Sequence, residues 1–151
     1  MTVIAYRDGV LAADTGAFFG DVCASFTQRK VVRTKFGELA AACGEVPQIE
    51  QFHSWLNAGA NLDDKPFKDV EEQGFGAIIV RPSGKLELID HQLRFYEPGA
   101  DFAVEGCHQE FMLALMLAGY SAIDTVAMAI KHCSHASGEV YSLKLGDTDG
   151  D

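Results

Sequence analysis

The sequence predicts a single domain of mixed α and β structure. Short apolar runs separated by glycine-containing turns recur along the chain, and three longer segments carry apolar residues at helical spacing. The length of 151 residues suits one domain with a sizeable core. We therefore expect one domain over residues 1–151, with a folded core over 2–145 and a polar, acidic tail over 146–151 that frays.

The first part of the chain is expected to consist of β-hairpins. Asp8-Gly9 separates two apolar runs, and Phe36-Gly37 separates two more, and such dipeptides favour tight turns. Residues 18–28 show no decided pattern. The expected strands cover residues 3–6, 10–13, 30–34 and 38–42.

A helix of about a dozen residues is expected from Val46 onward. Ile49, Phe52 and Leu56 recur at helical spacing, Pro47 suits the first turn, and Gly59 is a plausible stop. The polar segment 61–73 then predicts a surface loop with at most one short helical turn.

The second half alternates between strands and helices. Pro82 and Gly84 lie in a turn between the hairpin strands 77–80 and 86–89, and short strands are expected at 95–96 and 102–104. Two helices are expected over 108–118, ended by Gly119, and over 122–132, with Ser121 as N-cap. The last strand is expected over 140–145.

Composition excludes several classes of function. Lys and Arg number 12 against 22 Asp and Glu, so the net charge of −10 repels a phosphate backbone and disfavours nucleic-acid binding. No apolar run reaches the roughly 18 residues of a membrane span, and no signal pattern begins the chain. We expect a soluble, cytoplasmic protein without a membrane partner.

The four cysteines do not predict a disulfide framework or a metal site. Cys23, Cys43, Cys107 and Cys133 are widely spaced, and none forms a Cys-x-x-Cys pair. Adjacent residues such as those of segment 132–135 rarely point at one ion. We expect reduced thiols, no bound metal and no cofactor.

Thr2 is the candidate nucleophile. If Met1 is removed, Thr2 carries a hydroxyl and a free α-amine on one residue, and such an amine has an ordinary pKa of roughly 7.7 to 8. The unprotonated fraction can take the hydroxyl proton, directly or through water. Simple initiator removal is the expected processing, with no propeptide to cleave. A threonine after the initiator is also common without catalysis, so position alone leaves both interpretations open.

Three further features follow Thr2 in order. Asp14 closes an apolar strand, Lys30 opens the next strand pair, and Gly44 follows a run of alanines. This ordered set resembles the proteasome β-subunit family of N-terminal nucleophile hydrolases, which includes bacterial heat-shock ring proteases and smaller phage or bacterial relatives. The similarity extends from Thr2 to about Leu145.

The resemblance implies a role for each of these residues. Thr2 would attack a peptide carbonyl, Asp14 and Lys30 would hold the charge balance, and the Gly44 N–H would stabilise the oxyanion. A Lys30 ammonium would lower the pKa of the nearby amine, and Asp14 would keep Lys30 charged. Ala42 matches the floor of the primary specificity pocket. Without the resemblance, each residue has an ordinary structural interpretation. Lys30 is then a charge at a strand edge, Asp14 a turn residue and Ala42 a core residue.

Two positions depart from the family pattern. The catalytic-site serine of Gly-Ser-Gly is replaced by Glu105, and the Asp before the final Ser-Gly is replaced by Cys133 or Ser134, depending on register. Neither Cys133 nor Ser134 is a carboxylate. Glu105 either supplies a compensating carboxylate or forms a salt bridge in a repurposed pocket.

The resemblance also implies an α+β fold in the form of a four-layer α/β/β/α sandwich, and closed homo-oligomeric rings of six or seven subunits, single or stacked. A protein or peptide substrate and an unfoldase partner would accompany such rings. The leading hypothesis is a threonine peptidase that acts through Thr2. The alternatives are a catalytically inactive ring subunit with an assembly or binding role and, third, a hydrolase of small amides.

Overall fold

The computed structural model describes residues 1–68, 70–71 and 74–148, in a mixed α and β fold. Eleven strands and three helices follow the chain in these residues. In chain order they are β1 (Val3–Arg7), β2 (Val10–Asp14), β3 (Ala17–Phe19), β4 (Val22–Ser25), β5 (Val31–Arg33), β6 (Leu39–Cys43), α1 (Val46–Asn57), β7 (Gly76–Val80), β8 (Leu86–Ile89), β9 (Phe95–Tyr96), β10 (Phe102–Gly106), α2 (Gln109–Leu117), α3 (Ala122–His132) and β11 (Val140–Lys144).

One antiparallel sheet is built around the first strand. Its order is β10-β1-β2-β11, so β1 and β2 are central and buried. The hairpin between them turns at Asp8 and Gly9, whose φ values of 52° and 80° are the left-handed values that this dipeptide favours. Val3 lies opposite Gly106 of β10, and Asp14 lies opposite Val140 of β11. Three distant segments therefore meet where β1 begins.

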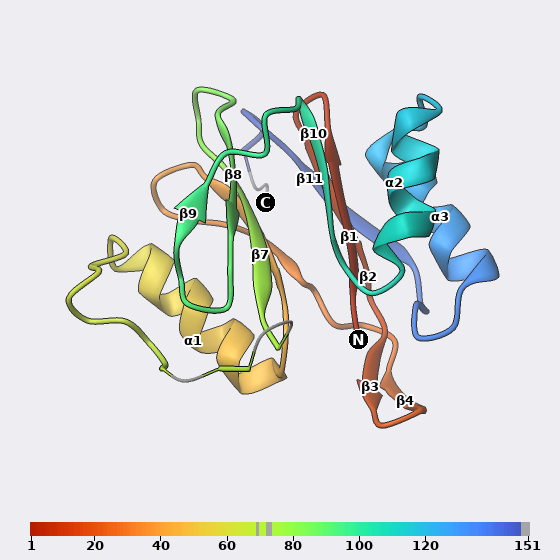
Figure 1. The fold of residues 1–151 in the computed structure, drawn as a ribbon, viewed down its shortest axis with the longest axis horizontal. Helices are drawn as coiled ribbons and strands as arrows, with labels where there is room; N and C mark the ends of the chain where they lie inside the picture. Colours follow the sequence, from red (N-terminus) through yellow and green to blue (C-terminus); the bar gives the residue numbers. More distant parts are fainter. Residues whose placement is uncertain (69, 72–73, 149–151) are drawn as a thin grey trace.

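A second antiparallel sheet has the order β5-β6-β7-β8-β9. Its central strands β6 and β7 are almost fully buried. The undecided segment 18–28 contains a small separate hairpin, β3 with β4, which has a register shift between Ala17 and Phe18. This hairpin extends away from both sheets near the amino terminus (Figure 1).

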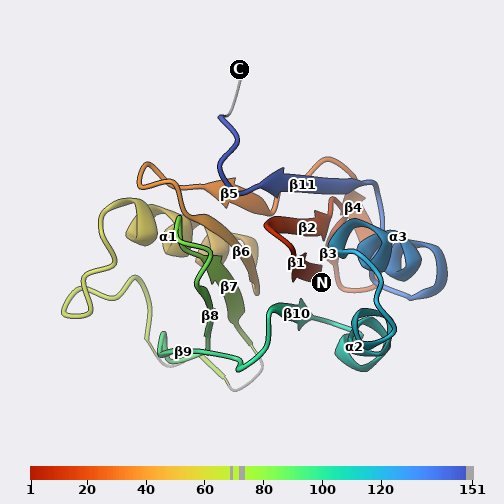
Figure 2. The ribbon, with the colours of Figure 1, turned by 90° about the horizontal axis from the view of Figure 1, so that it is seen from above.

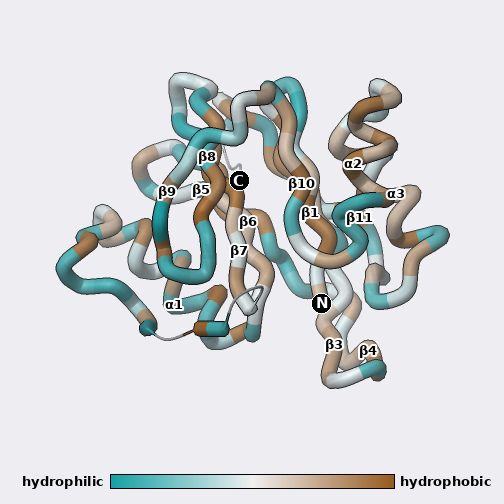
Figure 3. The backbone as a smooth tube through the Cα atoms, in the orientation of Figure 1, coloured by the Kyte–Doolittle hydropathy of each residue, from teal (hydrophilic) through white to brown (hydrophobic). Residues whose placement is uncertain are grey.

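The two sheets pack face to face, with a helix or helices on each outer face (Figures 1 and 2). Ile4, Leu11 and Ile78 belong to the apolar cluster between the sheets. Phe52 of α1 packs in a second cluster, on the outer face of the five-stranded sheet. Met112 of α2 belongs to a third cluster, which it shares with α3 on the outer face of the other sheet. Figure 3 shows the apolar residues concentrated along these strands and α2, with a hydrophilic loop after α1.

The expected elements are present with small shifts at their ends. Ser121 caps α3, since its hydroxyl accepts from the backbone N–H of Asp124 at 3.0 Å. Helix α2 begins at Gln109, one residue later than expected, because His108 takes a left-handed φ of 57° where the chain turns out of β10. The described part of the loop 61–73 contains turns and no helix; its residues 69 and 72–73, and residues 149–151 of the expected tail, lie outside the described residues.

Within the described residues, no helix has the length and apolar character that crossing a bilayer requires.

Candidate active site

The amino-terminal end of β1 is held in place by the turn that follows β10. The Thr2 carbonyl accepts from the backbone N–H of Cys107 at 2.8 Å and from its thiol at 3.3 Å. Gly106 has φ +100°, and a Cβ there would lie 1.9 Å from the Thr2 carbonyl oxygen. Only glycine allows this approach. Thr2 itself is 4% exposed, so its backbone is fixed before any substrate arrives.

Asp14 lies at the end of β2 as a fully buried carboxylate. Its Oδ1 accepts from the Val3 backbone N–H at 3.1 Å and from the Lys30 ammonium at 2.7 Å. Its Oδ2 accepts from the Ser137 backbone N–H at 3.2 Å. A buried charge needs such partners, and here they connect the start of β1, the start of β5 and the loop before β11.

Lys30 precedes β5 and is 3% exposed. Besides Asp14, its ammonium donates to the Met1 carbonyl at 3.2 Å. Burial lowers the pKa of Lys30, and the charge and hydrogen bond of Asp14 offset that effect only in part. Burial is the larger effect on the Lys30 pKa, and Asp14 acts in the opposite direction by favouring the charged lysine. A proton is held less firmly on this amine than on an exposed lysine.

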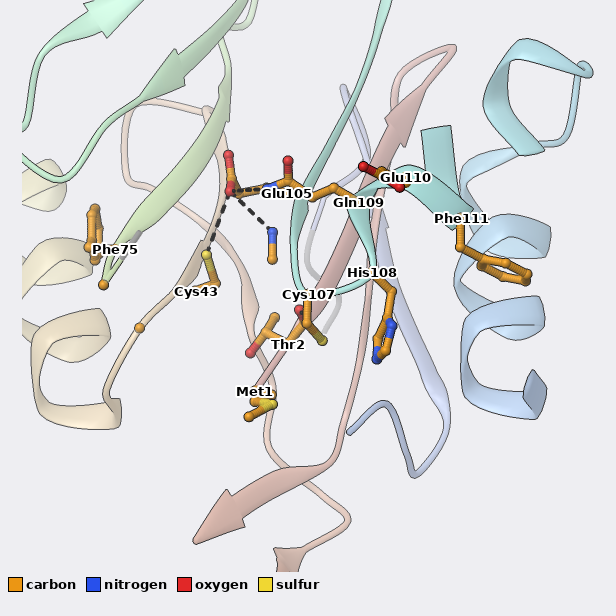
Figure 4. Close-up of a pocket in the computed structure, with 13 residues that line it drawn as sticks. Met1, Thr2, Cys43, Phe75, Glu105, Cys107, His108, Gln109, Glu110 and Phe111 are labelled. Carbon is orange, nitrogen blue, oxygen red and sulfur yellow. Dashed lines mark hydrogen bonds between the residues drawn. The ribbon is translucent and has the colours of Figure 1, made fainter. Parts of the chain in front are cut away.

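A cavity of about 940 Å³ opens at Thr2, between the ends of β6 and β10 (Figure 4). Thr2, Cys43, Gly44, Glu105 and Cys107 are among its lining residues. Gly44 has φ +150°, and a Cβ there would lie 3.1 Å from the Gly74 carbonyl oxygen. Gly44 therefore packs closely against Gly74, another residue of the wall of the cavity that Thr2 lines.

Glu105 reaches this cavity from β10. Its Oε1 accepts from the Gln109 side chain at 2.9 Å, from the Gly106 backbone N–H at 3.2 Å and from the Cys43 thiol at 3.9 Å (Figure 4). Burial raises the pKa of Glu105, and these hydrogen bonds offset the rise only in part. Burial and the nearby Glu105 charge raise the pKa of the Cys43 thiol to about 12, so Cys43 is a donor and not a thiolate.

Ala42, Cys133 and Ser134 lie outside the lining of this cavity. Ala42 is fully buried in the cluster under α1. Cys133 caps the carboxyl end of α3 and packs against the cluster beneath that helix. The Ser134 carbonyl accepts from the His108 ring. Thr2, Gly44 and Glu105 therefore line one cavity, and Asp14 and Lys30 contact each other and the backbone of Val3 and Met1 on either side of Thr2. Ala42, Cys133 and Ser134 neither line the cavity nor take part in these contacts.

Three functional neighbours were not anticipated from the sequence. Cys43 and Cys107 line the cavity, and the Ser137 backbone N–H holds Asp14. Each of the three residues is next to a glycine, at positions 44, 106 and 138. Because glycine allows another segment to approach the backbone closely, these glycines are the sequence feature that could have indicated the contacts. In the described part of the chain, no group of three or more His, Cys, Asp and Glu side chains is arranged to hold a metal ion.

The fold is shared with solved structures of BPH and HslV, which supports the expected resemblance to the proteasome-like fold. The chain is similar to BPH of Thiobacillus denitrificans in complex with epoxomicin, at TM-score 0.69 and 17% identity over 97% of this chain and 99% of that one. A second BPH structure gives TM-score 0.65, also at 17% identity over 97% and 99% of the two chains. Eukaryotic HslV from Trypanosoma brucei gives 0.69 at 16% identity, over 95% and 99%.

No protein-family model matches the sequence, and no curated protein matches it either. At 16 to 17% identity the likeness concerns the fold alone. The chemistry depends on the residues of this chain's own site.

Proposed function

We propose that this chain is a threonine peptidase that cleaves peptide bonds through an acyl-enzyme on Thr2 after removal of Met1. The observation that carries the proposal is the buried Lys30–Asp14 pair, whose ammonium lies 3.2 Å from the Met1 carbonyl at the mouth of the cavity that Thr2 lines. Met1 is 54% exposed and precedes a small residue, which supports its removal.

Removal of Met1 turns the amide nitrogen of Thr2 into an α-amine. The neutral amine takes the proton from the Thr2 hydroxyl as the oxygen attacks the substrate carbonyl. The protonated amine then returns that proton to the departing amine, which leaves an ester on Thr2. Water, deprotonated by the same amine, hydrolyses the ester and restores the hydroxyl.

Lys30 and Asp14 adjust this amine without touching the substrate's scissile bond. Loss of Met1 removes one acceptor of the Lys30 ammonium and leaves that ammonium beside the new α-amine. A nearby positive charge lowers the pKa of the amine and keeps more of it neutral near pH 7. Asp14 fixes the position of Lys30, and the Gly44 N–H is the proposed donor to the oxyanion.

We further propose that the packing of sheets and helices is the four-layer α/β/β/α sandwich, and that subunits assemble into cytoplasmic rings of six or seven, single or stacked.

Large apolar side chains that are exposed on the β3–β4 hairpin and its flank support assembly: Phe19 is 85% exposed, Val22 67% and Phe26 59%. Leu117 of α2 is 70% exposed. Native mass spectrometry would give the subunit number, and an unfoldase partner would act on such a ring.

An inactive ring subunit is the second candidate. Its support is that Cys133 and Ser134, the candidates for the position of the family's Asp, carry no carboxylate and do not line the cavity, and that Glu105 stands at the serine position. This chain would then keep the fold for assembly alone.

Hydrolysis of peptides by the wild-type protein and by Thr2→Ala separates the two candidates. The proposal predicts cleavage by the wild type, a processed terminus that begins at Thr2, and loss of cleavage in Thr2→Ala. Equal cleavage by the two proteins, or an active protein that retains Met1, would contradict it. Because Thr2→Ala keeps the chain length and a small side chain, circular dichroism should be unchanged.

A further inference from the structure

Glu105 lines the cavity, and the two oxygens of its carboxylate are held differently. All three of its hydrogen bonds go to Oε1, from Gln109, Gly106 and Cys43. Among the residues the structure describes, Oε2 accepts none. A carboxylate held by one oxygen is fixed in place, and its second oxygen retains lone pairs for a ligand.

The opposite sheet leaves room for this carboxylate. A Cβ on Gly76, the first residue of β7, would lie 2.7 Å from the Glu105 Cδ and 3.2 Å from its Oε2. Glycine at this position is what admits Glu105 between the ends of the two sheets. The side chain is therefore built into the cavity wall at a defined place, unlike a solvated surface glutamate.

Within the described residues, no cationic side chain forms an ion pair with Glu105. In the described lining of the cavity there is no Lys or Arg, and Lys30 is committed to Asp14. A carboxylate that is withdrawn from water without a cation is costly, and a cationic ligand would relieve that cost. The raised pKa of Glu105 agrees with this lack of a cation.

We propose that Glu105 is a specificity residue, which selects substrates with a cationic side chain, such as that of Arg or Lys, beside the scissile bond. This inference rests on the proposed peptidase function. The substrate cation donates to Oε2, while Oε1 stays bound to Gln109 and Gly106. Glu105 and Thr2 line one cavity, so a substrate acylating Thr2 places a neighbouring side chain within it.

The test uses pairs of peptides that are identical except at one position, where one peptide has arginine and the other citrulline. The varied position is each of the two residues before and the two residues after the scissile bond in turn. Citrulline has nearly the same shape as arginine and carries no charge. At one position the wild-type protein should cleave the arginine peptide at least about tenfold more efficiently in kcat/KM, as expected for one hydrogen bond between charged groups. Glu105→Gln should reduce that ratio to near one. The amide oxygen can still accept from Gln109 and Gly106, but an NH₂ group replaces Oε2 and cannot accept from the substrate cation.

Glu110→Gln is the matched control, because Glu110 is an exposed cavity-lining residue whose removal changes the net charge equally. The ratio should persist in Glu110→Gln. A ratio near one in the wild type would overturn the specificity proposal while leaving the peptidase in place. An equal loss of cleavage of the arginine and citrulline peptides in Glu105→Gln would also overturn the specificity proposal, because Glu105 would then act on the catalytic centre.

If the wild type cleaves neither peptide, the proposed function fails, and binding decides the role of Glu105. N-acetyl-arginine amide and N-acetyl-citrulline amide would be titrated by NMR. Preferential binding of the arginine ligand by the wild type, lost in Glu105→Gln, supports recognition of a cation. Equal binding of both ligands contradicts it.

Discussion

Two ion groups, one buried and one partly exposed, differ in the cation that they use. At the amino terminus, Lys30 pairs with Asp14 at 2.7 Å. In the five-stranded sheet, Arg81 bridges Glu38 and Glu87, with Nε lying 2.7 Å from the Glu87 Oε1. The Lys30 ammonium donates to the carbonyl of Met1, a residue that lines the cavity of Thr2, whereas no residue of the second group lines that cavity or bonds to Met1 in the contacts of the described residues.

The difference shows in how firmly each cation holds its proton. Burial lowers the pKa of Lys30, and Asp14 offsets this only in part. Burial also lowers the pKa of Arg81, but hydrogen bonds and charges from Glu87 and Glu38 outweigh it and raise the net pKa. An arginine paired with two carboxylates stays charged at all ordinary pH values. The pKa of a buried lysine, in contrast, depends strongly on its surroundings. Under the proposed function, the Arg81 group stabilises the fold and the Lys30–Asp14 pair adjusts the amine of Thr2.

Neutralising each cation should give the largest contrast. Lys30→Met leaves the fully buried Asp14 without its cation and should cost about 3 to 5 kcal/mol of unfolding free energy. Peptide hydrolysis should fall by about 10²- to 10⁴-fold, since the amine loses the charge that keeps it neutral. Arg81→Met should destabilise the fold while leaving kcat/KM unchanged. Denaturant unfolding and initial rates measure both.

The double variant Asp14→Asn with Lys30→Met controls for misfolding, because it removes both charges together. It should recover part of the lost stability and none of the activity. Full activity in either Lys30 variant would show that Lys30 is merely structural.

Exchanging the two cation types should give intermediate effects. Lys30→Arg forces a larger guanidinium into a site that is 3% exposed and should cost about 1 to 3 kcal/mol of unfolding free energy. It should also reduce hydrolysis, because the new cation no longer fits beside Thr2. Arg81→Lys loses one of two carboxylate partners and should cost about 1 to 2 kcal/mol with no change in rate. A rate loss in Arg81→Lys would remove the distinction between the groups.

Glu105 is a partly buried acid, and Gly76→Ala tests how closely it packs. The added methyl would lie 2.7 Å from the Glu105 Cδ, and such overpacking should cost about 1 to 3 kcal/mol of unfolding free energy. In the background Glu105→Ser, which shortens the side chain, the cost should be smaller. A double-mutant cycle measures this coupling by denaturant unfolding. Equal costs in both backgrounds would mean that Glu105 does not press against Gly76.

The smallest effect concerns the pH dependence of stability. Because burial raises the pKa of Glu105 above its ordinary 4.5, the folded protein holds that proton more tightly than the unfolded chain. The associated stability is full below about pH 4.5 and is lost as pH rises through the folded pKa. Glu105→Gln should therefore gain unfolding free energy relative to the wild type as pH increases above 4.5. A constant difference across that window would contradict the raised pKa.

The sequence predicted the elements well because their signals are local. Asp8-Gly9 and the helical spacing from Ile49 to Leu56 each lie within a dozen residues, and both elements formed as expected. The hairpin β3–β4 was undecided because its strands are short, partly exposed and shifted in register.

The site was harder to predict because its contacts join distant segments. Asp14 meets the Ser137 backbone N–H, 123 positions away, and no local pattern encodes that bond. The approach of Glu105 to Gly76 is equally non-local. Thr2 was named from its position after Met1, whereas Asp14, Lys30 and Gly44 were given roles only through the resemblance to a family.

The central claim is that Thr2 presents a free amine beside its own hydroxyl, and a peptide epoxyketone tests it most directly, because this probe bonds to both groups of an amino-terminal threonine. Intact-protein and peptide mass spectrometry of the treated wild type should show one adduct per chain, on a terminal peptide that begins at Thr2. Thr2→Ala should show none. A wild-type protein that stays unlabelled, or that carries Met1 on every chain, would contradict the account.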